Sequence, residues 1–191
     1  MSNDQPGCIE VICGGMFSGK TEELIRRLRR IIIAQMKVQV FKPIIDTRYQ
    51  SDRITSHIGT SLLANPIEQA LLIPYKIEAE TCVIAIDEVQ FFEPIIVEVC
   101  NELAKQGKRI ICAGLDMDFR GEAFETTARL MAIAEKVDKL HAICSVCGAD
   151  ASLTQRLVNG DPASINDPII MLGADESYQA RCRQCYEIKY S

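Results

Sequence analysis

The chain has 191 residues, of which 48% are hydrophobic and 25% charged, with 11 glycines and 7 prolines. This length suits one domain or one domain with a small accessory module, and this composition excludes a fibrous repeat and a largely disordered chain. The formal net charge of −5 argues against a scaffold that binds nucleic acid or an anionic membrane.

The beginning of the chain predicts a strand, a tight turn and a helix. Cys8–Cys13 is a short apolar run that ends at two glycines. After Thr21, leucine and isoleucine recur at helical spacing. Four arginines (Arg26, Arg27, Arg29 and Arg30) fill the other face, which we interpret as a solvated or subunit-contacting face because the chain as a whole is acidic.

Further strands and helices alternate along the chain. Apolar and β-branched runs predict strands over Val38–Phe41, Thr81–Ile86 and Arg109–Leu115. Helices are expected from Pro94 to near Gly107 and over Thr126–Lys136. This alternation predicts an α/β fold with a mainly parallel sheet.

The remaining segments set the expected domain organisation. The segment from Asp46 to Pro74 has no clean period and should contain a mobile loop at 50–60. A last strand is expected over Val137–Ile143, after which paired cysteines begin. We therefore predict an α/β domain at 1–143 and a small module with paired cysteines at 144–191. The absence of an apolar stretch of about 18 residues and of a signal peptide predicts a cytoplasmic protein with no membrane partner.

A phosphate-binding motif follows the first predicted strand. The pattern G-x-x-x-x-G-K-[ST] is matched by Gly14, Gly15, Met16, Phe17, Ser18, Gly19, Lys20 and Thr21. In such a turn, backbone N–H groups and the helix N-terminus attract phosphate oxygens, a lysine reaches the outer phosphates, and the threonine can bind Mg²⁺. A mere glycine-rich turn is the alternative, which the strand–turn–helix context disfavours.

Two carboxylates end the strand predicted over Thr81–Ile86. Asp87 suits a Mg²⁺ ligand, and Glu88 could accept a proton from an attacking hydroxyl or water, unless it is only a solvated charge. Aromatic residues follow: Phe91 and Phe92, then Phe119 and Phe124. They could stack on a flat base or pack the core, and for Phe92 we favour the core.

The nine cysteines divide by pattern. Five stand singly in apolar runs and are interpreted as core residues: Cys8, Cys13, Cys82, Cys100 and Cys112. The other four form two C-x-x-C pairs, Cys144 with Cys147 and Cys182 with Cys185. This spacing favours a structural, tetrahedral Zn²⁺ site over redox chemistry, and four thiolates leave no open position for catalysis.

These motifs, with Asp46-Thr47-Arg48-Tyr49, the segment Ile86–Phe92, Gly114-Leu115-Asp116 and Tyr178, resemble the cytosolic, zinc-containing class of thymidine kinases nearly end to end. The resemblance implies a RecA-like core and a zinc-ribbon-like module that carries a substrate loop. It implies transfer of the γ-phosphoryl group of ATP to the 5′-hydroxyl of thymidine or deoxyuridine, giving dTMP and ADP in deoxynucleotide salvage. A homotetramer and feedback inhibition by dTTP are further implications.

The resemblance also implies roles for residues. Glu88 matches the general base, with Arg48 and Lys20 in catalysis. ATP contacts fall on residues 14–21 with Asp46, Asp87 and Gln90, and Mg²⁺ on Thr21 and Asp87. The nucleoside would contact Met16, Phe91, Leu115, Phe119, Phe124, Thr154, Ile170, Met171, Leu172, Gly173 and Tyr178. The loop between the cysteine pairs would close over the base and read it through backbone groups. His57 and His141 receive no role.

Three other interpretations are weaker. A P-loop GTPase would carry an Asn-Lys-x-Asp motif, which the sequence lacks. A RecA-like ATPase acting on nucleic acid would need a basic surface. A zinc-ribbon binding module would leave the first 140 residues without a role.

Overall fold

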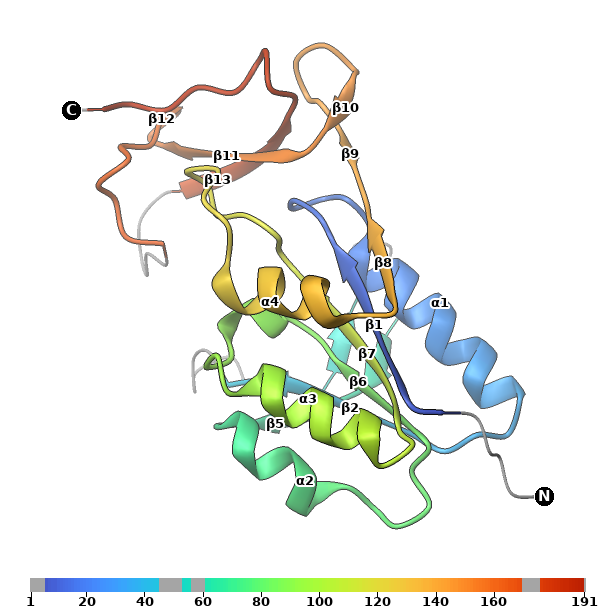
Figure 1. The fold of residues 1–191 in the computed structure, drawn as a ribbon. Coiled ribbons are helices and arrows are strands. Elements are labelled where there is room, and N and C mark those ends of the chain that lie inside the picture. Colours follow the sequence, from blue (N-terminus) through green and yellow to red (C-terminus); the bar gives the residue numbers. More distant parts are fainter. Residues whose placement is uncertain (1–5, 45–52, 56–60, 170–175, 191) are drawn as a thin grey trace.

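A parallel sheet forms the centre of the molecule in the computed structural model, which describes residues 6–44, 53–55, 61–169 and 176–190 (Figure 1). Its strands are β1 (Cys8–Cys13), β2 (Val38–Pro43), β5 (Asn65–Ile67), β6 (Val83–Ile86), β7 (Arg109–Gly114) and β8 (Lys136–Lys139). Within these residues the sheet has six strands, in the order β5-β2-β6-β7-β1-β8, and every neighbouring pair is parallel. The predicted α/β fold with a mainly parallel sheet is confirmed.

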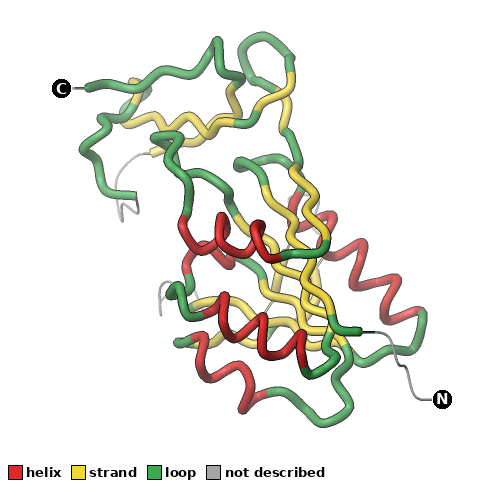
Figure 2. Tube along the Cα trace, in the orientation of Figure 1, coloured by secondary structure: helices red, strands yellow, loops and turns green. Residues whose placement is uncertain are grey.

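Helices cover both faces of this sheet (Figure 2). On one face lies α1 (Lys20–Ile33), which buries Leu24 and Leu28 against Val83 and Ile111 of the sheet. On the other lie α3 (Ile96–Lys105) and α4 (Glu125–Ile133). Because successive side chains of a strand point to opposite faces, a strand covered on both sides must be apolar throughout. This explains the continuous apolar runs of β6 and β7.

Two predictions about polar and cysteine residues of this core are wrong. Arg27, expected on a solvated helix face, is buried because it forms ion pairs with Glu10 at 2.6 Å and with Glu23 at 2.8 Å. The neighbouring arginines 26, 29 and 30 are exposed as expected. Cys82, expected in the core, is exposed because β6 begins one residue later.

The helix predicted over Thr126–Lys136 ends earlier, at Ile133. The Glu135 N–H donates to the Ile9 carbonyl at 3.0 Å, and the Glu135 carboxylate accepts from the Ile9 N–H at 2.6 Å. These bonds draw the chain to the edge of β1, where Lys136–Lys139 pairs as β8. A long-range sheet contact therefore overrides the helical pattern.

The segment 46–74 contains more regular structure than its sequence predicts. Strands β3 (Arg53–Thr55) and β4 (Ser61–Leu63) pair antiparallel, and β5 joins the central sheet. A single turn of 3₁₀ helix, η2 (Ala70–Leu72), leads into α2 (Ile73–Lys76). Of the loop expected at 50–60, residues 53–55 form β3, and the others lie outside the described residues.

The C-terminal segment forms small antiparallel sheets beyond the central one, at the top of Figure 1. Strand β9 (Ala142–Ile143) pairs with β10 (Asp150–Ala151). Strand β11 (Leu153–Val158) lies between β12 (Asp161–Pro162) and β13 (Glu176–Arg181). The strand predicted over Val137–Ile143 is thus divided between two sheets, and the domain boundary at 143 stays a prediction. Over the described ranges, no helix has both the length and the apolarity needed to cross a membrane.

Candidate active site

The turn between β1 and α1 has a backbone that glycine alone adopts easily. Gly14 has φ 140° and Gly19 has φ 83°, both in the region that L side chains rarely occupy. A Cβ atom at Gly14 would lie 2.2 Å from the Leu140 carbonyl oxygen. The Lys20 ammonium donates to the Gly15 carbonyl at 2.7 Å, and burial lowers the pKa of Lys20. The turn therefore holds a cation at the start of a helix, an arrangement that suits a phosphate group.

Two carboxylates follow β6 and face different surroundings. Asp87 is buried, and this burial, with the neighbouring charge of Glu88, raises the pKa of Asp87 to about 7. Glu88 has φ 51° and ψ 40°, a left-handed conformation that costs a non-glycine residue about 1–2 kcal/mol. The resulting kink directs Glu88 into a cavity while Asp87 stays behind it. The two carboxylates therefore differ in burial and in access to the cavity, while their predicted roles stay predictions.

The raised pKa predicts that Asp87→Asn stabilises the nucleotide-free protein at pH 8. A carboxyl that titrates near 7 when folded, but near 4 when unfolded, binds its proton more tightly in the fold. The fold therefore loses stability as pH rises through this range, and a neutral amide avoids that loss while still accepting the Glu88 N–H bond, 3.0 Å long. Melting temperatures in EDTA should differ at pH 8 and converge near pH 4. Equal melting temperatures at pH 8 would contradict the prediction.

A cavity of about 410 Å³, large enough for a small ligand, opens at the carboxyl ends of β1, β6 and β7. Its lining comes from the glycine-rich turn, the start of α1, the segments that follow β6 and β7, and the C-terminal segment. The residues are Met16, Phe17, Gly19, Lys20, Thr21, Glu22, Glu88, Phe91, Leu115, Met117, Asp118, Phe119, Phe124, Thr154, Ile169 and Tyr178.

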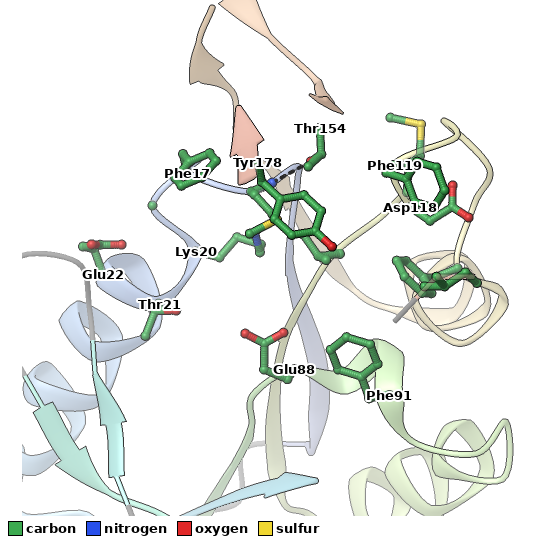
Figure 3. Close-up of a pocket in the computed structure, with 16 residues that line it drawn as sticks. Phe17, Lys20, Thr21, Glu22, Glu88, Phe91, Asp118, Phe119, Thr154 and Tyr178 are labelled. Carbon is green, nitrogen blue, oxygen red and sulfur yellow. Dashed lines mark hydrogen bonds between the residues drawn. The ribbon is translucent and has the colours of Figure 1, made fainter. Parts of the chain in front are cut away.

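The cavity is chemically divided (Figure 3). Lys20 and Thr21 at the start of α1 lie on one side, and Phe91 and Phe119 lie on the other. Glu88 lies between these two groups. A ligand with an anionic end and a flat apolar end would fit this division, with Glu88 near the junction of the two ends.

The aromatic wall of the cavity consists of Phe91, Phe119 and Phe124, and defined contacts hold these rings in place. The rings of Phe91 and Phe124 meet edge to face, with centroids 6.1 Å apart. Phe119 is buried, and its carbonyl accepts a hydrogen bond of 2.5 Å from the Tyr186 hydroxyl. Phe92 lies in the core beneath α3, as its pattern favours. The four phenylalanines thus divide between cavity and core.

The C-terminal segment directly contacts the glycine-rich turn between β1 and α1. The Thr154 hydroxyl on β11 accepts a hydrogen bond of 3.0 Å from the Met16 N–H, drawn as a dashed line in Figure 3. Tyr178 on β13 extends over the middle of the cavity. The small antiparallel sheet and the glycine-rich turn therefore line the same cavity.

Most predicted nucleoside contacts meet at this cavity: Met16, Phe91, Leu115, Phe119, Phe124, Thr154 and Tyr178. Gly14, Gly15 and Ser18 form the turn but do not line it, and Asp87 and Gln90 are buried outside it. Asp46, Arg48, His57 and the predicted loop contacts Ile170, Met171, Leu172 and Gly173 lie outside the described residues. His141 is exposed.

Sequence reasoning missed four lining residues: Glu22, Met117, Asp118 and Ile169. Each of them lies one or two residues from a predicted contact in the sequence. This proximity is the sequence feature that could have identified them as lining residues. Asp118 has a structural task, because its carboxylate accepts the N–H groups of Arg120 at 2.8 Å and of Glu122 at 3.1 Å. These bonds close the loop that carries Phe119.

The two cysteine pairs come together as predicted. The sulfur atoms of Cys144, Cys147, Cys182 and Cys185 all lie within 4.8 Å of one another. Tetrahedral Zn²⁺ with bonds of about 2.3 Å needs sulfurs somewhat under 4 Å apart, and Cys147 and Cys182 are 3.6 Å apart. The four cysteines are therefore positioned to bind a metal ion.

The thiols of this cluster interact strongly. A backbone contact with Cys182, then other backbone N–H groups, lower the pKa of Cys144 to about 6. Contacts with Cys182 and Cys147 raise the pKa of Cys185 to about 12. Backbone N–H groups likewise lower the pKa of Cys182. Because close thiolates repel one another, a cation among the four sulfurs would favour their ionised forms.

Comparison with known proteins places the chain in a family. The crystal structure of domain III from the Thermotoga maritima replication initiation protein DnaA is similar to 69% of this chain, with 18% identity and a TM-score of 0.39. The chain spans about half of that structure, 54% of its length. A sequence model described as thymidine kinase matches residues 7–186. Because this match covers nearly the whole chain, the chain belongs to the thymidine kinase family.

Proposed function

We propose that the protein transfers the γ-phosphoryl group of ATP to the 5′-hydroxyl of thymidine or deoxyuridine, giving dTMP and ADP in deoxynucleotide salvage. One observation carries this proposal: a single cavity joins Lys20 and Thr21 of the phosphate loop to an aromatic wall, with Glu88 between them. Membership of the thymidine kinase family supports the same class of substrate.

The phosphate side would act by positioning and charge neutralisation. Lys20, whose ammonium donates to the Gly15 carbonyl, would turn to the outer phosphates. Thr21 and the buried carboxylate of Asp87 would hold Mg²⁺, which neutralises phosphate charge when it is bound. A cation bound beside Asp87 would favour its ionised form, against the burial that raises the pKa of Asp87 in the metal-free protein. Arg48 and Asp46 keep their predicted phosphate roles as proposals.

The nucleoside side would hold thymine between apolar faces. Phe91, Phe119, Phe124 and Tyr178 supply these faces, and Glu88 would accept the proton of the 5′-hydroxyl as it attacks. Residues 170–173 remain candidates for reading the base edge through backbone groups. A base that left those groups unpaired would be rejected at their desolvation cost.

Zn²⁺ bound by the four-cysteine cluster would have a structural role, because four cysteine ligands leave no coordination position for a substrate. We further propose a cytoplasmic homotetramer inhibited by dTTP, which combines a thymidine with the phosphates that the loop would bind. Division into residues 1–143 and 144–191 is part of the same proposal.

The decisive assay follows radiolabelled γ-phosphate from ATP to a panel of nucleosides, with free phosphate measured alongside. We expect label in dTMP and dUMP, little on deoxyadenosine, and little free phosphate. An ATPase is the alternative, because the P-loop and Asp87, taken without the aromatic wall, suit an ATPase equally well. An ATPase would release labelled free phosphate and would label no nucleoside. Efficient labelling of deoxyadenosine would contradict a pocket fitted to thymine.

A further inference from the structure

Gln90 is a buried amide directly behind Glu88. It lies in η3 (Val89–Phe91), the short 3₁₀ helix that follows the kink at Glu88, and it is only 6% exposed. It does not line the cavity, so contact with a ligand does not explain a polar side chain at this depth. Burial of an amide is costly unless its polar atoms have partners.

Both ends of the amide are occupied. The Gln90 Nε2 donates to a Glu88 carboxylate oxygen at 2.5 Å, and the Gln90 Oε1 accepts from the Leu115 N–H at 3.0 Å. A backbone N–H can only donate, so Leu115 fixes the amide oxygen on its own side. The NH₂ group must then face Glu88. The rigid end of β7 thereby determines which group meets the carboxylate.

The neighbouring backbone is shaped to admit this side chain. A Cβ atom at Gly114 would lie 2.6 Å from the Gln90 Oε1 and 2.8 Å from Val89 Cγ1. Any larger residue at 114 would displace the amide. The charge of Lys20 also acts on the Glu88 carboxylate, and among the described residues Gln90 supplies the side-chain hydrogen bond that holds this carboxylate.

We infer that Gln90 is a positioning residue, which holds one carboxylate oxygen of Glu88 so that the other faces the substrate hydroxyl. This inference rests on the proposed function, in which Glu88 is the base. A hydrogen bond to an ionised group is shorter and stronger than a neutral one, which suits it to this task. Gln90 would then raise kcat through Glu88, a role that replaces the ATP contact that the family resemblance implies for it.

The test is a double-mutant cycle of Gln90→Met with Glu88→Gln, followed by single-turnover transfer from ATP to thymidine. Methionine matches glutamine in length but donates no hydrogen bond. Loss of a hydrogen bond to a charged group predicts a fall in kcat of roughly tenfold to a hundredfold, with the KM for ATP within about twofold. In the Glu88→Gln background the same change should lower kcat by less than about twofold, because the base is already absent.

Gln155→Met is the matched control. Gln155 is equally buried, accepts from the Glu187 N–H at 2.9 Å, and has no bond to Glu88. Its effect should be the same in both backgrounds. If Gln90→Met does not fold, Gln90→Asn replaces it, because its shorter amide cannot span both partners.

A purely structural Gln90 would act through Leu115, raise the KM for thymidine and give equal effects with or without Glu88. Such additivity overturns the inference while leaving the kinase intact. Absence of any transfer by the wild-type protein would instead overturn the proposed function.

Discussion

Glu88→Gln should lower kcat for thymidine phosphorylation roughly a hundredfold to ten-thousandfold, the range expected when a positioned general base is removed. The amide keeps the shape of the side chain but cannot take up the proton of the 5′-hydroxyl. The KM for ATP should change little, because Lys20 and the turn at 14–19 are untouched. Steady-state kinetics with varied ATP and thymidine measure both constants.

Glu22→Gln is the control for charge. Glu22 lines the same cavity on the phosphate side and lies away from the aromatic wall. Its neutralisation should reduce kcat far less than Glu88→Gln does. Near-normal turnover of the Glu88→Gln variant would remove Glu88 from the mechanism, whatever the control shows.

Cys182→Ser should abolish zinc binding by the cluster and raise the KM for thymidine by up to about tenfold, with a smaller effect on the KM for ATP. The sulfur of Cys182 belongs to the four-cysteine cluster, and the Cys182 carbonyl accepts the Tyr186 N–H at 3.1 Å. The Tyr186 hydroxyl in turn donates to the Phe119 carbonyl on the cavity wall. Loss of this hydrogen bond should raise the KM for thymidine by up to about tenfold. Metal analysis and thymidine kinetics on the same preparation check both parts.

Two further variants separate the effect of the metal from the effect of the tether, the hydrogen bond from the Tyr186 hydroxyl to the Phe119 carbonyl. Cys82→Ser alters an exposed cysteine outside the cluster and should leave metal content and KM unchanged. Tyr186→Phe should keep the metal yet raise the KM for thymidine, because only the bond to Phe119 is lost. Wild-type protein purified without any zinc would refute the metal assignment, and an unaltered KM for Tyr186→Phe would refute the tether.

The sequence by itself determined the chemistry of short segments. The turn from Gly14 to Thr21 could be identified because its glycines and lysine recur at fixed spacing within one short segment, and this spacing determines the backbone geometry of the turn. The four-cysteine cluster could also be predicted from the sequence, because each C-x-x-C pair is a local pattern and two such pairs supply the four ligands of one metal ion. Strands buried on both faces were visible as continuous apolar runs.

Only the tertiary structure decided which distant segments meet. The end of α4 could not be read from its residues, because the bonds of Glu135 to Ile9 that stop it join positions far apart in the chain. Burial of Arg27 likewise depends on Glu10 from another element. The contact of Gln90 with Glu88 and Leu115 was hidden for the same reason, since a sequence records neighbours along the chain and hydrogen bonds depend on neighbours in space.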